Sequence, residues 1–128
     1  SRDSKKGISL NEILDFKNKN EINTNVNAYL WRASLNILSF APLISTDALG
    51  GTIITDWYVN NKIKNERIKV TAFIKTAELK SNGISVKVHV QKFKDGSWSE
   101  TFTNKELETK IENNILNEAR NLRINSYK

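Results

Sequence analysis

The chain has 128 residues, enough for one domain with a single core. It contains no cysteine and one histidine, which excludes disulfides, thiolate metal sites, thiol nucleophiles and any metal site that needs two imidazoles. Lysine and arginine number 20 against 14 acidic residues, giving a net charge of +6, so the expected partners are phosphates, anionic membrane surfaces or acidic proteins. The alternative interpretation is that these charges form an ordinary solvated surface, which keeps the protein soluble and binds no partner.

Residues 1–23 are polar and rich in lysine and asparagine, and they predict an arm or tether ahead of a single α+β domain at residues 24–128. Within the arm, Ser9 and Glu12 have the spacing of a capping box, with Ile13, Leu14 and Phe16 along one short helix. No stretch of the sequence approaches the ~20 consecutive apolar residues of a membrane span.

The domain is expected to begin with a helix followed by a strand. Apolar residues recur at steps of three and four over residues 25–40, which predicts a helix with Asn25 as its N-cap. Pro42 prevents the helix from continuing. After Gly50 and Gly51, residues 52–59 are β-branched and aromatic, which predicts the first strand.

Two further strands are predicted at residues 67–75 and 84–91, where apolar and polar residues alternate. Asp95 and Gly96 predict a hairpin turn into a short strand near residues 98–102, and Thr103 with Glu106 form a capping box for a C-terminal helix. Short connections favour an antiparallel meander of three to four strands. The predicted fold is an α+β two-layer sandwich with the N-terminal and C-terminal helices on one face.

If the helices cover one face of the sheet, the other face is basic and aromatic. The candidate binding residues on this face are Tyr58, Arg67, Lys69, Phe73, Lys75, Lys87, His89, Gln91 and Phe93, joined by Ile54 from the first strand. Cations interleaved with rings on a sheet are typical of single-stranded nucleic-acid binders. An apolar patch with exposed aromatics is equally typical of a protein-binding surface.

Asp56 and Trp57 form a second candidate motif, because aspartate is uncommon inside a strand. Asp56 could serve as a base in a pocket with Trp57 and Arg67, or it could pair with Arg67 or Lys69 across the hairpin. One histidine and no nucleophile elbow leave no catalytic triad, so no catalytic residue is assigned and neither a cofactor nor a metal is expected.

Several runs resemble a known family. They are VNAYLWRASL from Val26, LSFAPL from Leu38, ITDWY from Ile54 and NER from Asn65, with further matches in the C-terminal helix up to Arg123. Together they resemble the proteobacterial family known as domain of unknown function 3576. The resemblance implies an exported protein, generally a predicted lipoprotein whose signal peptide and lipid-modified cysteine lie upstream, and it implies no activity.

Three functions follow as expectations. The first is a non-enzymatic envelope lipoprotein domain, on the periplasmic side, that binds an envelope protein or polymer. The second is a module that binds nucleic acid with the same sheet face. Nucleic acid is the less favoured partner because the protein is expected to be exported. The third is a small-ligand binder or enzyme with a pocket near Asp56. Exposed edge strands of two chains could also pair with each other, which would form a homodimer.

Overall fold

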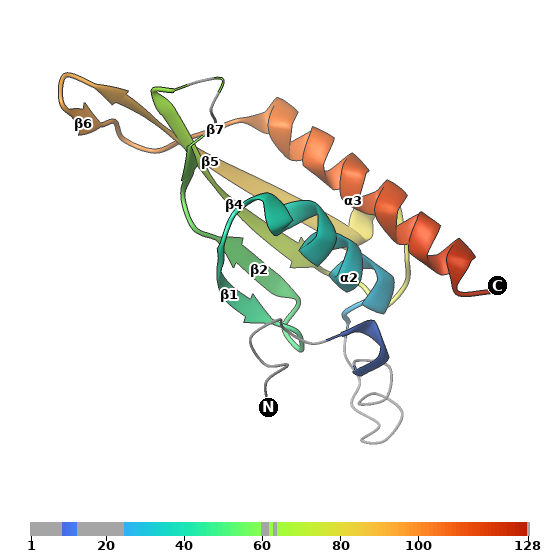
Figure 1. Cartoon of the computed structure of the whole chain (residues 1–128). Helices are drawn as coiled ribbons and strands as arrows, with labels where there is room; N and C mark the ends of the chain where they lie inside the picture. The colour runs from blue at the N-terminus through green and yellow to red at the C-terminus, as the bar shows by residue number, and fades with distance from the viewer. Residues whose placement is uncertain (1–8, 13–24, 60–61, 63, 128) are drawn as a thin grey trace.

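In the described residues, a curled antiparallel sheet and two long helices form the main part of the fold (Figure 1). The computed structural model describes residues 9–12, 25–59, 62 and 64–127. Helix α2 (Ala28–Ile37) and helix α3 (Lys105–Asn125) pack against each other and on the same side of the sheet. The predicted α+β class, with an N-terminal and a C-terminal helix, is confirmed.

The sheet is a meander in which chain neighbours pair. Its order is β1 (Leu43–Asp47), β2 (Thr52–Thr55), β4 (Glu66–Ile74), β5 (Ile84–Lys94) and β6 (Ser97–Trp98). Two short strands lie off this path, since β3 (Tyr58–Val59) pairs with β4 and β7 (Phe102–Thr103) pairs with β5. Across the described residues the sheet therefore has seven strands where three to four were predicted, because β1 was not expected and two predicted strands are interrupted.

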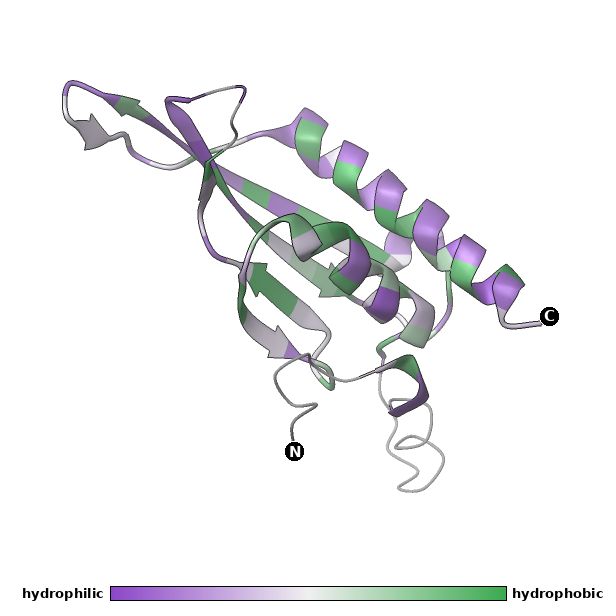
Figure 2. Cartoon of the chain, in the orientation of Figure 1, coloured by the Kyte–Doolittle hydropathy of each residue, from purple (hydrophilic) through white to green (hydrophobic). Residues whose placement is uncertain are grey.

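The core lies between the sheet and the helices, where the alternation predicted for β4 and β5 is observed. Residues of even number from Val70 to Ile74 and from Ile84 to Val90 are buried against the helices. Trp31 on α2 and Ile115 on α3 are fully buried in the same cluster. Figure 2 shows the apolar residues of α3 recurring along its length, as expected for a helix with one face on a core.

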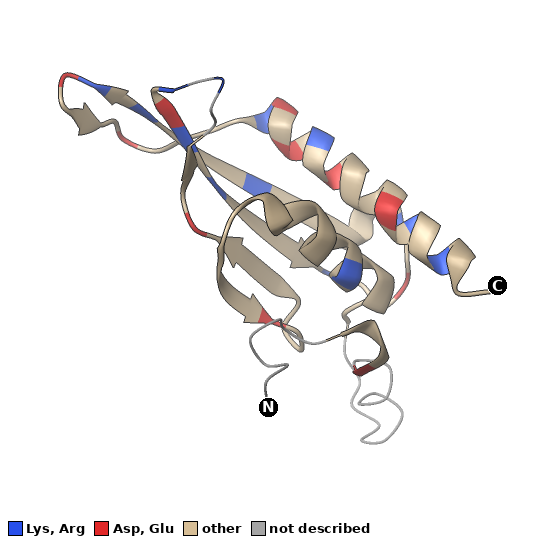
Figure 3. Cartoon of the chain, viewed as in Figure 1, with Lys and Arg blue, Asp and Glu red and all other residues tan. Residues whose placement is uncertain are grey.

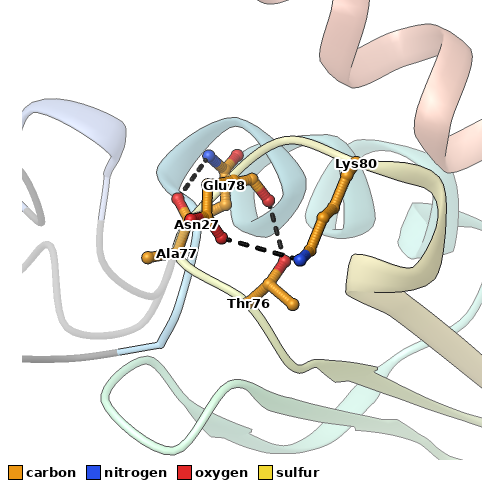
Figure 4. Close-up of polar contacts among 5 residues, drawn as sticks. All are labelled: Asn27, Thr76, Ala77, Glu78 and Lys80. Atoms are coloured by element: carbon orange, nitrogen blue, oxygen red, sulfur yellow. Dashed lines mark hydrogen bonds and ion pairs between the residues drawn. The ribbon is translucent and has the colours of Figure 1, made fainter.

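Helix α2 begins two residues later than predicted. Its N-cap is Asn27, whose Oδ1 accepts a hydrogen bond from the Leu30 N–H at 2.9 Å, so the prediction of Asn25 is wrong. Asn27 also donates from Nδ2 to the Ala77 carbonyl at 3.0 Å, in the loop that joins β4 to β5 (Figure 4). The cap therefore joins the start of the helix to the end of the sheet, a role that Asn25 does not have.

Helix α3 begins after Asn104, whose Oδ1 accepts from the Leu107 N–H at 3.0 Å. The predicted cap, Thr103, belongs to β7, where it lies opposite His89. Because the backbone of Thr103 pairs with β5, Thr103 remains in the strand, and Asn104 is the N-cap of the helix. Among the described residues, no helix has both the length and the apolar character needed to cross a bilayer.

Helix α3 also protects one edge of the sheet. On the edge of β5 that faces away from β4, strand β7 pairs only with His89 and Val90. The earlier amides of β5 that point to this edge have no neighbouring strand among the described residues. Glu108 accepts from the Val88 N–H at 2.9 Å, and Glu112 accepts from the Val86 N–H at 2.8 Å. Two carboxylates one helical turn apart therefore take the place of a partner strand.

The capping box predicted in the arm is present. Ser9 N–H donates to the Glu12 carboxylate at 3.0 Å, and Glu12 N–H donates to the Ser9 hydroxyl at 3.2 Å. The hydrogen bond from the Ser9 backbone, followed by one with its side chain, lowers the pKa of Glu12 below its ordinary value of 4.5. Ile13, Leu14 and Phe16 lie outside the described residues.

Candidate binding surface on the open face of the sheet

The open face is the side of the sheet turned away from α2 and α3. On β4 and β5, and just past the end of β4, it carries Arg67, Lys69, Thr71, Phe73, Lys75, Ser85, Lys87, His89, Gln91 and Phe93. The register places Arg67 opposite Gln91 and Lys69 opposite His89. All of the predicted binding residues on these two strands therefore share one surface.

The open face is basic where β4 and β5 form it. Arg67, Lys69, Lys75 and Lys87 lie there, and none of these four cations pairs with a carboxylate within the described part of the chain. Neither strand places a carboxylate on this side, whereas α3 carries acidic and basic residues in alternation (Figure 3). The positive charge of the protein is thus partly gathered on one side.

Aromatic rings interrupt this basic surface. Phe73 and Phe93 are 38% and 42% exposed, which is high for side chains of their size. Phe93 contacts Trp98 edge to face, with ring centroids 5.2 Å apart. Exposed rings among cations give the open face both apolar area and charge.

Arg67 is the most constrained cation on the open face. Its guanidinium carbon lies 4.6 Å from the ring centroid of Trp57 and 4.2 Å from that of Trp98. Nε and Nη2 both donate to Gln91 Oε1, at 2.8 and 2.6 Å, and Gln91 in turn donates to the Thr101 hydroxyl. Two cation–π contacts and two hydrogen bonds therefore hold the guanidinium in place.

Trp57 can contact Arg67 because the predicted strand at residues 52–59 is broken. Ile54 lies opposite Thr71 and Tyr58 lies opposite Ile68, so four steps along one strand match three along the other. The extra residue is a β-bulge at Asp56 and Trp57, and it reverses which face each later side chain occupies. Trp57 is thereby turned toward the open face and Tyr58 away from it.

The prediction that Tyr58 belongs to the open face is therefore wrong. Its register partner Ile68 has the same parity as the core residues of β4, and the Tyr58 ring contacts Phe40 edge to face at 5.3 Å. Simple alternation from Ile54 would have kept Tyr58 on the open side. The bulge, which alternation does not encode, changes that outcome.

Asp56 makes local contacts at the bulge. Its N–H donates to the Pro42 carbonyl at 2.8 Å, and its carboxylate accepts from the Trp57 N–H at 2.8 Å. Among the described residues it forms no ion pair with Arg67 or Lys69, so the predicted pairing is wrong. Its role in the structure is to fix the bulge that orients Trp57.

A hollow of about 540 Å³ opens on the helix side of the sheet, not beside Asp56. Tyr58, Glu66 and Lys110 line it, while Asp56, Trp57 and Arg67 do not. Within the described residues, histidine, aspartate and glutamate form no group of three that could hold a metal ion. Asp56 therefore takes no part in this hollow.

Trp98 and Thr101 contact Arg67 and Gln91 on the open face, and neither was predicted from the sequence as a site residue. A usable signal was present. The two-residue turn at Asp95 and Gly96, both with positive φ, pairs Phe93 with Trp98. Once Phe93 is placed on the open face, its cross-strand partner must follow it there.

Comparison with known proteins agrees with the resemblance noted in the sequence. The chain is 40% identical over 103 residues, 80% of its length, to a protein of Rickettsia prowazekii (strain Madrid E) described as "Uncharacterized protein RP420". The chain spans 62% of the length of that relative. No solved structure matches. Residues 24–124 match the family described as "Domain of unknown function (DUF3576)", and the chain therefore belongs to that family.

Proposed function

We propose that this domain is a non-enzymatic binding module whose open face binds an acidic surface of another protein. The observation that carries the proposal is the gathering of the four cations of the open face, none of them ion-paired within the described residues, beside exposed aromatic rings on a side where β4 and β5 place no carboxylate. Complementary charge steers a partner to such a face and fixes its orientation. Arginine and aromatic side chains are the types enriched in the centres of protein interfaces.

A protein partner fits the open face better than single-stranded nucleic acid does. Nucleic-acid binders of this kind stack bases on the faces of aromatic rings. Here Arg67 already occupies one face of Trp57 and one face of Trp98. The rings therefore serve to hold a cation, and the cation is the group presented to the partner.

Exported, lipid-anchored location in the cell envelope is part of the proposal. It is supported by the resemblance to predicted lipoproteins and by the polar composition of residues 1–23, rich in lysine and asparagine, which suits a tether. Fatty-acid labelling of the full-length gene product, with fractionation of the cells, tests it. Labelled protein in the envelope fraction is the expected result, and unlabelled protein in the cytoplasm would contradict it.

The binding proposal is tested by photo-crosslinking in the cells that produce the protein. A photoreactive residue at Ser85, on the open face, is expected to capture a protein with an acidic surface, and one at Asn113, exposed on α3, is not. Lys87→Glu and Phe73→Asp should each abolish the Ser85 crosslink. The matched control is Lys110→Glu, which makes the same charge change on α3 and should leave the crosslink intact.

Three results would contradict the proposal. One is a Ser85 crosslink that survives both open-face substitutions. Another is equal capture from Ser85 and Asn113, which would indicate contact without a defined surface. The third is capture of nucleic acid from Ser85 with loss of the crosslink in Lys87→Glu, which would assign the face to the other class of partner.

A further inference from the structure

Arg67 differs from the other cations of the open face in how little freedom it has. The side chains of Lys75 and Lys87 are exposed and make no hydrogen bond or ring contact among the described residues. Arg67 is half-buried, lies between two indoles, and donates twice to Gln91. Binding of a partner to Arg67 therefore costs little side-chain entropy, because the side chain is already ordered.

One side of the guanidinium is still available. Nε and Nη2 donate to Gln91, while Nη1 has no hydrogen-bond partner within the described part of the chain. Gln91 is itself fixed by its bond to Thr101, so it cannot turn away to leave Arg67 mobile. The Nη1 donors are therefore the ones that a ligand on the open face can use.

We infer that Arg67 is the anchor of the open face and that it receives a carboxylate side chain of the acidic partner. This inference rests on the proposed function and adds to it the residue and the chemical group at the centre of the contact. Lys69, whose Nζ lies 5.5 Å from the Trp57 ring centroid, supplies a second cation beside the anchor. Charged hydrogen bonds to a guanidinium are the stronger kind, and they are directional.

The shape of the cluster suits a planar carboxylate. Trp57 is brought by the β3 side of β4 and Trp98 by the β6 side of β5, so the indoles flank the guanidinium. A planar carboxylate can approach in the plane of the guanidinium, between the rings.

The test measures binding of octaglutamate to the 128-residue chain by isothermal titration calorimetry at low salt. Arg67→Lys keeps the charge but loses the planar fork, and it is expected to weaken binding by about tenfold. Lys94→Arg, a charge-conserving change on the β5–β6 hairpin, is the matched control and should leave the affinity unchanged. Octaglutamate should also alter the tryptophan fluorescence, because Trp57 and Trp98 contact the anchor while Trp31 is buried.

The outcomes separate this inference from the proposed function. If Lys87→Gln weakens binding and Arg67→Lys does not, the open face binds acidic partners but Arg67 is not its anchor. If neither change weakens binding, or octaglutamate does not bind at all, both fail. An eight-nucleotide oligothymidylate that binds more tightly than octaglutamate, and depends on Arg67, would overturn the choice of carboxylate. Circular dichroism of each variant excludes unfolding as the cause.

Discussion

Thr55 shows how one buried hydroxyl can complete a sheet at an irregular point. The side chain is fully buried, and its Oγ1 accepts from the Val70 N–H at 2.9 Å. This bond lies where the ladder between β2 and β4 stops, just before the bulge. The hydroxyl therefore satisfies an amide that would otherwise be buried without a partner.

Thr55→Val keeps the shape of the side chain and removes the acceptor. We expect the free energy of unfolding to fall by about 1–3 kcal/mol, the cost of a buried unsatisfied donor. Urea denaturation measures the change, with Thr52→Val, half-buried on the same strand, as the control. Equal effects of the two substitutions would show that the Val70 bond has no special value.

Ser34 presents the opposite case. It is fully buried in α2, and its hydroxyl has no hydrogen-bond partner in the described structure. Ser34→Ala removes this group and introduces the best helix-forming residue, so the free energy of unfolding should rise by about 1 kcal/mol. Ser39→Ala serves as the control, because the Ser39 hydroxyl donates to the Asn36 carbonyl. Destabilisation by Ser34→Ala would mean that the hydroxyl is satisfied after all.

At the scale of elements, the contact between α3 and β5 depends on carboxylates as well as apolar packing. Glu108 is only 5% exposed and accepts from the Val88 amide. We expect Glu108→Leu to lower the free energy of unfolding by about 2–3 kcal/mol, because a charged acceptor is lost and a buried amide is left unpaired. Glu108→Gln should cost less, since its amide oxygen can still accept.

Hydrogen exchange gives this prediction a local readout. The Val88 amide should exchange faster in Glu108→Leu relative to amides within the β4–β5 ladder, such as that of Thr71. Glu106→Leu, an exposed change in the first turn of the same helix, should alter stability by only a few tenths of a kcal/mol (about 0.3–0.5) through the helix dipole. Unchanged exchange at Val88 in Glu108→Leu would show that the carboxylate does not protect the edge.

The capping box at residues 9–12 predicts a pH effect of known sign. The folded pKa of Glu12 is lowered by Ser9, so its contribution to the capped helix is fully present above its unfolded value near 4.5. That contribution is lost as the pH falls through the lower, folded pKa. In an NMR titration, Ser9→Ala should move the Glu12 pKa part of the way upward toward 4.5, because it removes the hydroxyl but keeps the backbone N–H that lowers the pKa most, while Ser81→Ala should not move it. An identical Glu12 midpoint in the Ser9→Ala and unmodified chains would contradict the role of the Ser9 hydroxyl.

The elements also show which parts of the fold a sequence can reveal. Alternation located β4 and β5 correctly because one face of each strand is buried and the other is wet. Alternation failed at Tyr58, since a bulge depends on the Pro42 and Thr55 contacts made by chain segments that are distant in sequence. For the same reason, Arg67 could be placed on the open face, but its position between Trp57 and Trp98 could not.

For the whole molecule, the question is whether binding follows the net charge or its arrangement. Replacing Lys69, Lys75 and Lys87 by glutamine reduces the net charge from +6 to +3 and removes three cations from the open face. Replacing Lys94, Lys105 and Arg120 by glutamine gives the same net charge of +3 and leaves the open-face cations in place. The two variants differ only in where positive charge remains.

If the open face is the binding surface, only the first variant should lose affinity for octaglutamate. With each surface charge contributing about 0.5 kcal/mol, three losses amount to about 1.5 kcal/mol, or roughly tenfold in the dissociation constant. Titration calorimetry at low and physiological salt measures both variants, and the difference between them should shrink as salt screens the charges. Equal losses in both variants would mean that the protein attracts anions as a uniformly basic particle. Since surface charges far from a bound ligand are screened within about a Debye length of ~8–10 Å, a defined surface predicts unequal losses.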